Sequence, residues 1–386
     1  MDGLQRRFVE HYAALAEVCF DETLLGNDDF DRLDEERENL RFALDLALEI
    51  DPALALDLAR RLVPSWVRRG EYREGRERLA TALNQSPEAP GLLRAWALRG
   101  AALLASQQSD LAVADDLGYE ALAIFRELGD RRGEGWTLQV LGWNAMARGE
   151  YGDAARLFEE AADVHSGLGD EQLQIVALIA LASVESAQGN PARAIEVLRD
   201  VVASARLEGR RFRLAMALHN LGVAQDQVGE TEQARRSMEE SIALHRQDGR
   251  KPALAIGLCN LGYVLRPTDP DEAMTHFLES LVISREIEEP RTIAYCLDGV
   301  ANVLASRGGY ARATTLLGAA SAIRTRTGAV SSPVRQTRRD TVEAQCRAEL
   351  SAEVFTRAWE KGGSLGAVAA AEWALRLWGE SEWAPM

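Results

Sequence analysis

One stretch of the chain matches the residue pattern of a catalytic motif. Residues 362–366, GGSLG, fit the pattern GxSxG, in which a serine on a sharp turn between a strand and a helix acts as a nucleophile. The residues just before it, 359–361, instead read as the end of a helix. We therefore interpret Ser364 as the N-cap of a following helix, where its hydroxyl would accept a backbone N–H, and we do not expect hydrolase chemistry.

The histidines and cysteines do not form a metal-binding pattern. The five histidines and four cysteines lie far apart in the sequence: His11, His165, His219, His245, His276, Cys19, Cys259, Cys296 and Cys346. They include no HExxH pair and no CxxC spacing. A zinc site needs three or four such ligands converging on one ion. We predict no metal site, no disulfide framework and no bound cofactor.

Paired carboxylates are the third pattern that could do chemistry. They occur at 159–160 and 239–240, Glu-Glu in both places. Two neighbouring acids can act as general acid and general base when burial separates their pKa values. Here both pairs fall on predicted solvent faces of helices, so we interpret them as solvated charge. The three patterns together predict a protein that is not an enzyme.

A repeat of about 40 residues sets the elements that carry any binding residues. Glycines and leucines share that period: Gly129, Gly169, Gly209 and Gly249, with Leu141, Leu181, Leu221 and Leu261. Small residues extend the series at steps of 39 or 40: Gly75, Ala114, Ala154, Ala194, Ala234, Ala273 and Ala313. A fixed period of this length indicates a solenoid of stacked two-helix units. The small residues would let neighbouring helices approach closely.

The segments before the repeats also read as helices. Residues 4–19 and 31–50 have amphipathic spacing and are separated by a loop around 26–28. A third helix runs from 51 to about 69 and contains Pro64, which predicts a kink there. We assign residues 1–69 to an N-terminal helical cap.

The pattern changes again after the last repeat. Residues 325–337 read as a loop, followed by helices at about 335–350, 353–361 and 364–378. The end of a solenoid needs a cover for its open core. We therefore assign 70–325 to the repeats and 326–386 to a C-terminal helical cap.

Composition narrows the setting and the partners. The formal net charge is −16, from 44 basic and 60 acidic residues, which disfavours direct binding to nucleic acid. The chain has neither a signal-peptide pattern nor an apolar run long enough to span a membrane. Widely spaced cysteines fit a reducing compartment. The composition predicts a cytoplasmic protein without membrane contact.

The repeat resembles the tetratricopeptide repeat. Leu138, Leu141 and Gly142 match its LxxLG step, and Ala154 and Phe158 match its second helix. The resemblance covers about 70–325. It implies an all-α fold, a right-handed superhelical solenoid of tetratricopeptide-like helix pairs with helical caps.

The same resemblance implies a concave groove lined by the first helix of each pair. Transferred by position, it gives these candidate binding residues: Trp96, Arg99, Trp136, Gln139, Trp143, His219, Asn220, Asn260, Tyr263, Arg266, Tyr295 and Asn302. The rule also reaches Met146, Ile179, Ser183, Ser186, Val223, Asp226, Cys259 and Asp298. Aromatic and polar side chains together suit an extended peptide, a helix or a small hydrophobic inducer. The alternative, in which the aromatics are inter-repeat core and the asparagines bond within the stack, stays open.

A second resemblance covers most of the chain. Residues 31–44, 62–83, 310–324 and 355–375 resemble the C-terminal helical-repeat region of large bacterial ATPase-type transcription regulators, including the LuxR-type and antibiotic-regulatory proteins. In that family the region senses an inducer or a partner protein. No GxxxxGK[ST] occurs in this sequence and no helix-turn-helix domain is visible. The resemblance therefore implies a sensor role without ATPase or DNA-binding activity in this chain.

Three functional hypotheses follow. The first is a non-enzymatic protein-interaction solenoid that forms the sensor or regulatory region of a bacterial signalling or transcription-control system. The second is a free-standing scaffold or adaptor that assembles other proteins. The third is a repeat protein that binds a small molecule or a peptide inducer. The sequence leaves the identity of the partner and the oligomeric state open.

Overall fold

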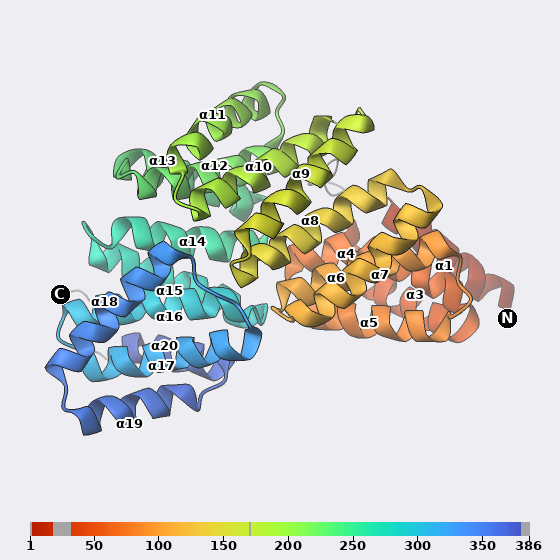
Figure 1. The fold of residues 1–386 in the computed structure, drawn as a ribbon. Helices are drawn as coiled ribbons and strands as arrows, with labels where there is room; N and C mark the ends of the chain where they lie inside the picture. Colours follow the sequence, from red (N-terminus) through yellow and green to blue (C-terminus); the bar gives the residue numbers. More distant parts are fainter. Residues whose placement is uncertain (1, 18–31, 170, 380–386) are drawn as a thin grey trace. The chain divides into compact units, whose positions relative to one another are not determined.

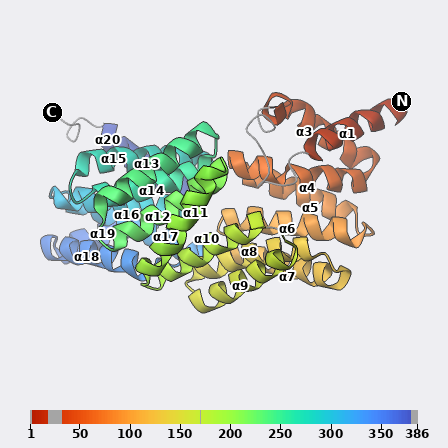
Figure 2. The same ribbon diagram turned by 90° about the horizontal axis from the view of Figure 1, so that it is seen from above.

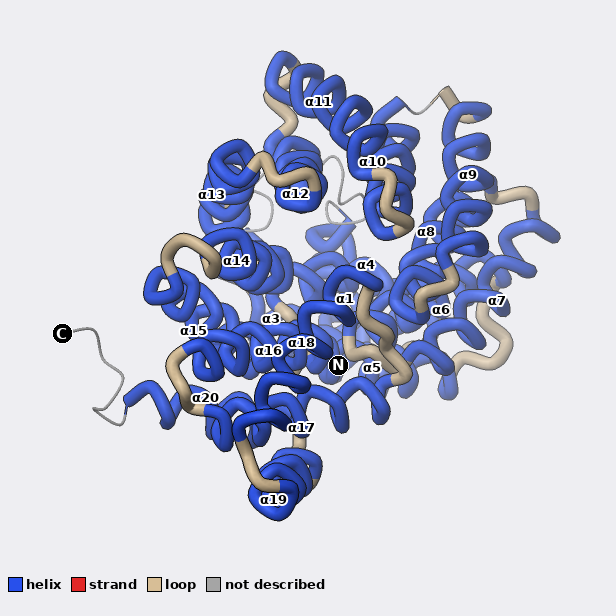
Figure 3. Tube along the Cα trace, turned by 60° about the vertical axis from the view of Figure 1, so that its left-hand side comes forward, coloured by secondary structure: helices blue, strands red, loops and turns tan. Residues whose placement is uncertain are grey.

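The described part of the chain is helical throughout. In the computed structural model these residues are 2–17, 32–169 and 171–379, and within them no strand occurs (Figure 3). The predicted loop around 26–28 and Cys19 lie outside the described residues. Short turns join the helices, as the alternating apolar pattern and the regularly spaced glycines predict.

Seven helix pairs follow one another along the chain, and the first begins before the predicted repeat boundary at residue 70 (Figures 1 and 2). In chain order they are α4 (Pro52–Arg69) with α5 (Tyr72–Gln85), α6 (Gly91–Gln107) with α7 (Leu111–Leu128), α8 (Arg131–Arg148) with α9 (Tyr151–Gly167), α10 (Glu171–Ala187) with α11 (Pro191–Leu207), α12 (Arg211–Gln227) with α13 (Thr231–Gln247), α14 (Lys251–Leu265) with α15 (Pro270–Glu286), and α16 (Pro290–Ser306) with α17 (Tyr310–Thr327). The expected all-α, tetratricopeptide-like solenoid is confirmed.

Small residues in the second helices allow this stacking. All seven positions of the series from Gly75 to Ala313 are buried. At Gly75 a Cβ atom would lie 2.6 Å from a methyl carbon of Leu104 and 2.7 Å from the ring of Trp66. The glycine of the LxxLG step has the same role in the first helix, since a Cβ on Gly142 would lie 2.6 Å from the ring of Phe158. Protein interiors have no room for such an overlap.

The turns use residues that suit their backbone conformation. Gly129, between α7 and α8, has φ of +73°, a left-handed conformation that glycine adopts without steric cost. The turn between α14 and α15 contains no glycine, and two prolines, Pro267 and Pro270, lie there instead, as the sequence predicts. There the side chain of Asp269 accepts a hydrogen bond from the backbone N–H of Glu272 at 2.9 Å, and Pro270 begins α15.

Further helices flank the repeats. The helices α1 (Asp2–Glu17) and α3 (Arg37–Ile50) precede them. The described chain continues as a helix through Pro64, which lies inside α4. After the repeats come α18 (Pro333–Glu349), α19 (Ala352–Gly363) and α20 (Ala367–Gly379). The expected loop at 325–337 is therefore shorter than predicted, because α17 extends to Thr327 and α18 starts at Pro333, a residue suited to the first helical position.

The last helices close the end of the stack. A Cβ on Gly362 of α19 would lie 1.9 Å from the backbone oxygen of Thr315 in α17. A Cβ on Gly318 of α17 would lie 2.4 Å from the backbone oxygen of Trp359. Two glycines thus allow the backbones of α17 and α19 to touch. This explains Gly362 without a nucleophile elbow.

Contacts divide the chain into two compact units. The first comprises Met1–Asn144 and Gly152–Leu178, and the second comprises Ala145–Tyr151 and Ile179–Met386. The described helices include none that is both long and apolar enough to cross a membrane.

Candidate binding face

In the second unit, three consecutive first helices place predicted groove residues side by side. His219 comes from α12, Asn260 and Tyr263 from α14, and Tyr295 from α16. We call these four residues the tyrosine face. They come from the first helix of three successive repeats. The face combines aromatic rings with amide and imidazole groups.

A hydrogen bond joins two neighbouring helices within this face. The Nδ2 atom of Asn260 lies 3.1 Å from Nε2 of His219. Burial, together with the nearby positive charge of Arg335, lowers the pKa of His219 to about 4. The imidazole is therefore neutral at pH 7, and its Nε2 accepts the amide proton.

The two tyrosines are also connected. The Tyr263 hydroxyl donates a hydrogen bond of 2.7 Å to the backbone oxygen of Tyr295. The Tyr263 ring packs edge-to-face on Phe277 of α15, with 5.1 Å between ring centroids. Burial raises the pKa of Tyr263, so its hydroxyl stays protonated and remains a donor. Phe277 and the backbone of Tyr295 thus hold the Tyr263 ring in place. The ring also contacts Arg335 of α18.

Side-chain contacts place the helix α18 (Figure 1) on the tyrosine face. The Arg335 guanidinium lies over the Tyr295 ring at 4.3 Å and near the Tyr263 ring at 5.4 Å, and it donates to Oδ1 of Asn260. Arg338 donates to Oδ2 of Asp226 at 3.1 Å and lies 5.9 Å from the Tyr263 ring. Sequence reasoning missed both arginines, because it assigned this segment to a cap. The sequence feature that could have identified them is a helix with arginines three residues apart and few apolar residues.

A buried ion pair flanks this contact. Arg324 of α17 donates to Oδ2 of Asp298 in α16, and both side chains are about nine-tenths buried. Burial, together with the positive charges of Arg339 and Arg335, lowers the pKa of Arg324 to about 10. At pH 7 the guanidinium stays charged. With Arg335 and Arg338 of α18 in place, arginines outnumber carboxylates in this part of the second unit.

The first unit holds a second group of predicted groove residues, which we call the tryptophan face: Trp96, Arg99, Trp136, Gln139 and Trp143. Arg99 lies 5.0 Å from the centre of the Trp136 ring. Trp96 donates from Nε1 to Asp130 at 3.1 Å and packs edge-to-face on Phe125. Trp143 packs on Phe158 in the same way, at 5.2 Å.

These tryptophans are half-buried. Trp96 packs on Phe125, Trp136 on His165 and Trp143 on Phe158, all three partners in second helices. Each tryptophan therefore has a core contact and a part that is exposed to solvent. Gln139 is buried and lies 3.1 Å from Nε2 of His165.

Of the remaining candidates, Asn220 and Asn302 take no part in the contacts described for either face, whereas Arg266 lies close to Arg338, Tyr263 and Asp226. Asn220 donates back to the carbonyl oxygen of Met216, one turn earlier in its own helix, at 3.1 Å. Arg266 follows the end of α14, and burial lowers its pKa, as does the nearby charge of Arg338. Asn302 is half-buried near the end of α16.

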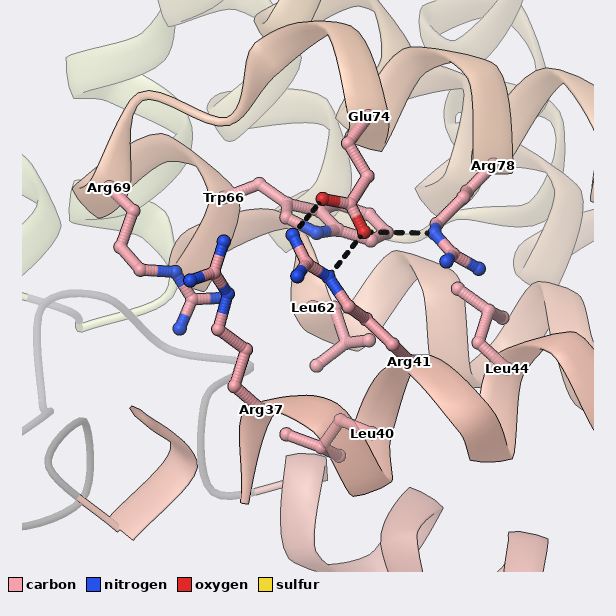
Figure 4. Close-up of a pocket in the computed structure, with 9 residues that line it drawn as sticks. All are labelled: Arg37, Leu40, Arg41, Leu44, Leu62, Trp66, Arg69, Glu74 and Arg78. Atoms are coloured by element: carbon pink, nitrogen blue, oxygen red, sulfur yellow. Dashed lines mark hydrogen bonds and ion pairs between the residues drawn. The ribbon is translucent and has the colours of Figure 1, made fainter. Parts of the chain in front are cut away.

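A small cavity in the first unit is lined by arginines but is already neutralised (Figure 4). Its volume is about 10 Å³, which is room for about one water molecule. Arg41 and Arg78 both pair with Glu74, while Arg37 and Arg69 pair with Glu71. Three further carboxylates, those of Glu38, Asp45 and Asp34, pair with Arg41, Arg78 and Arg69 respectively. This network holds α3, α4 and α5 together and offers no free charge to a ligand.

The residues considered for catalysis have structural contacts. Ser364 follows α19, and its hydroxyl donates to the carbonyl oxygen of Lys361 at 2.8 Å. The expectation that Ser364 caps the next helix is wrong, because α20 starts only at Ala367. Glu160 pairs with Arg126, and Glu240 pairs with Arg206. Among the described residues, no group of three or more histidines, cysteines and acids is placed to hold a metal ion.

The comparisons with known proteins agree with this fold. The tetratricopeptide repeat family matches residues 173–247. No curated protein matches the chain.

Several solved structures share the architecture at low sequence identity. One is a Rap protein in complex with competence and sporulation factor, with 12% identity, a TM-score of 0.57, and coverage of 91% of this chain and 100% of that one. A second is the Rap conjugation gene regulator of plasmid pLS20 with the Phr* peptide, with 12% identity, a TM-score of 0.56, and coverage of 84% and 95%. A third is NprR with its cognate peptide NprX, with 15% identity, a TM-score of 0.54, and coverage of 76% and 84%. At these identities the likeness concerns the fold.

Proposed function

We propose that this chain is a non-enzymatic solenoid that binds a peptide or a segment of a partner protein. The observation that carries the proposal is the tyrosine face, where three repeats together already hold side chains of a helix outside the repeats. Tyr295 and Tyr263 lie beside the Arg335 guanidinium, and Asn260 accepts its hydrogen bond. Aromatic rings with a few fixed polar groups are a common way to bind a peptide segment.

Two further points support the proposal. The three solved structures described above are complexes with a peptide or a signalling factor, and they share this architecture. The tryptophan face repeats the same mixture of rings and polar groups in the first unit, with Arg99 beside Trp136.

We further infer a regulatory role for this binding. The resemblance of residues 31–44, 62–83, 310–324 and 355–375 to the sensor region of ATPase-type transcription regulators supports a place in a bacterial, cytoplasmic control system. The reading frame upstream of this one tests the class. A nucleotide-switch module encoded there would support the sensor role, whereas its absence would favour a free-standing scaffold.

Affinity selection tests binding directly. The full chain is incubated with a random heptapeptide pool, separated by size exclusion, and the retained peptides are identified by mass spectrometry. We expect retention by the wild type and loss of the same peptides with Tyr295→Ala and with Asn260→Ala. Tyr119→Ala is the matched control, because Tyr119 is an exposed tyrosine of α7. Equal retention by all variants, or none by the wild type, would contradict the proposal.

A further inference from the structure

The helix α18 has two halves of different character. Its buried residues are Val342 and Cys346, both in the C-terminal half. The N-terminal half, Pro333–Asp340, is polar and has Arg335, Arg338 and Arg339. Apolar burial therefore anchors the C-terminal half, whereas polar side chains hold the N-terminal half on the repeats.

Two arginines make the contact of the polar half. Residues three apart in a helix project from the same side, so Arg335 and Arg338 reach the repeats together. Arg335 contacts Asn260, Tyr263 and Tyr295, as described above. Arg338 bonds Asp226 of α12. The two guanidinium groups thus span three consecutive first helices, α12, α14 and α16.

The contacts of the Arg335 guanidinium are favourable, but its hydrogen bonding is incomplete. A guanidinium over an aromatic ring with an amide acceptor is a well-suited cation site. Its Nη1 atom, however, is buried without a hydrogen-bond partner. The like charge of Arg324 also lies close by. A buried donor without an acceptor weakens the contact, so a ligand that satisfies these groups better could replace α18.

The chain as a whole favours a positively charged ligand. Its net charge of −16 attracts cations over distances comparable to the Debye length. With Arg335 and Arg338 lifted away, Arg266 remains near Asp226, and the surface beneath them presents the Asp226 carboxylate, the Asn260 amide oxygen and two tyrosine rings. These groups recognise guanidinium groups and not anions.

We propose that the N-terminal half of α18 is an internal occupant of the tyrosine face, and that the external ligand is a basic peptide segment with two arginines one helical turn apart. This inference rests on the proposed peptide-binding function and states its chemistry and control. The ligand replaces Arg335 and Arg338, and the polar half of α18 moves off the repeats. The apolar half stays anchored through Val342 and Cys346.

The chain supplies its own probe for this proposal. A fluorescein-labelled peptide of residues 331–345, SSPVRQTRRDTVEAQ, carries both arginines. In the wild type it competes with the tethered copy, whose effective concentration is on the order of millimolar. In the variant Arg335→Gln with Arg338→Gln, the tethered copy has lost its contacts. Fluorescence anisotropy then measures the dissociation constant for each full-length host.

We expect binding to the double variant at least about ten times tighter than to the wild type. The control host is Arg357→Gln, because Arg357 is an exposed arginine of α19 paired within its own helix. It should behave as the wild type does. A peptide with glutamine at both arginine positions should lose the gain, and so should adding Tyr295→Ala to the double variant. Melting curves by circular dichroism establish that each host is folded. If the double variant does not fold, the single variant Arg338→Gln replaces it as the host.

Three results would overturn the proposal: equal binding to the wild type and the double variant, equal binding of the glutamine peptide, or a gain that survives Tyr295→Ala. The heptapeptide selection separates this failure from failure of the proposed function. Peptides retained through Tyr295 without any effect of the α18 arginines would leave the binding function intact and remove the internal occupant.

Discussion

Asn260 connects a charged side chain to a neutral one. Its amide oxygen accepts from Arg335, and its Nδ2 therefore points to Nε2 of His219. The connection requires a neutral imidazole, because a protonated ring would have no acceptor and would repel Arg335. His245, a second buried histidine, is also held neutral. Burial lowers its pKa to about 3, with further contributions from His219 and Arg250.

These histidines predict a loss of stability in mild acid. Their pKa values in the folded state lie below the ordinary 6.5, so the unfolded chain takes up protons first as the pH falls. The free energy of unfolding should decrease from about pH 6.5 toward pH 4. Between pH 6.5 and 5 each histidine contributes at most roughly 2 kcal/mol.

Urea unfolding of the wild type and of His219→Gln with His245→Gln, at pH 7 and pH 5, measures this effect. Carboxylates titrate in both proteins, so the difference between them isolates the histidines. The variant should lose less stability on acidification than the wild type. An equal loss in both would show that the two rings do not differ in protonation between the folded and unfolded states.

The Arg324–Asp298 pair predicts a large effect of a single residue. Asp298→Ala leaves a buried guanidinium without its counter-charge, which costs about 3 kcal/mol of unfolding free energy. Glu240→Gln is the comparison, because Glu240 pairs with Arg206 on an exposed surface. Its cost should be below about 1 kcal/mol. Guanidinium chloride unfolding of both variants tests the contrast, and similar costs would contradict the assigned burial.

At the scale of elements, the turns show where the repeat is imperfect. Glycine occupies the turn between paired helices at Gly149, Gly189 and Gly229, each with positive φ. One repeat earlier the equivalent residue is Ser109, with φ of +62°. A residue with a Cβ adopts this conformation at a cost of about 1 kcal/mol. The Ser109 hydroxyl is also buried without a partner.

We therefore predict that Ser109→Gly stabilises the protein by about 1 kcal/mol, seen as a higher melting temperature. Part of that gain is offset by the greater freedom of glycine in the unfolded chain. Gly229→Ser is the reciprocal change, because a Cβ on Gly229 would meet no atom within 4 Å, and it should destabilise by a similar amount. A lower melting temperature for Ser109→Gly would mean that the serine makes a contact that outweighs its backbone cost.

The elements also show what the sequence could predict. Gly75 and the alanines at its period are buried in second helices as expected, because the period reports contacts between neighbouring repeats. The place of α18 was not predictable in this way. Arg335 lies 75 residues from Asn260, and Arg338 lies 112 residues from Asp226. A polar helix outside the period has no pattern that identifies its partner.

Ser364 illustrates a local limit of the same kind. A serine between two helices can cap the second or close the first, and the choice depends on where the second helix begins.

The division into caps at 1–69 and 326–386 around repeats at 70–325 stays a prediction, as does the assignment of the groove residues to binding.

At the scale of the whole molecule, charge and architecture combine into one account. An acidic solenoid presents aromatic and amide side chains from successive repeats, and one of its own basic helices occupies part of them. Attraction between an acidic protein and a basic ligand is screened by salt. Binding should therefore weaken as ionic strength rises.

Hydrogen exchange tests this account most directly. The wild-type chain is compared alone and with a peptide retained in the heptapeptide selection, and amide exchange is followed along α18 by mass spectrometry. We predict faster exchange at residues 335–341 in the complex, because Arg335 and Arg338 leave the tyrosine face, and unchanged protection at 343–349. Unchanged or slower exchange at 335–341 would show that the ligand binds while α18 stays in place, which contradicts the account.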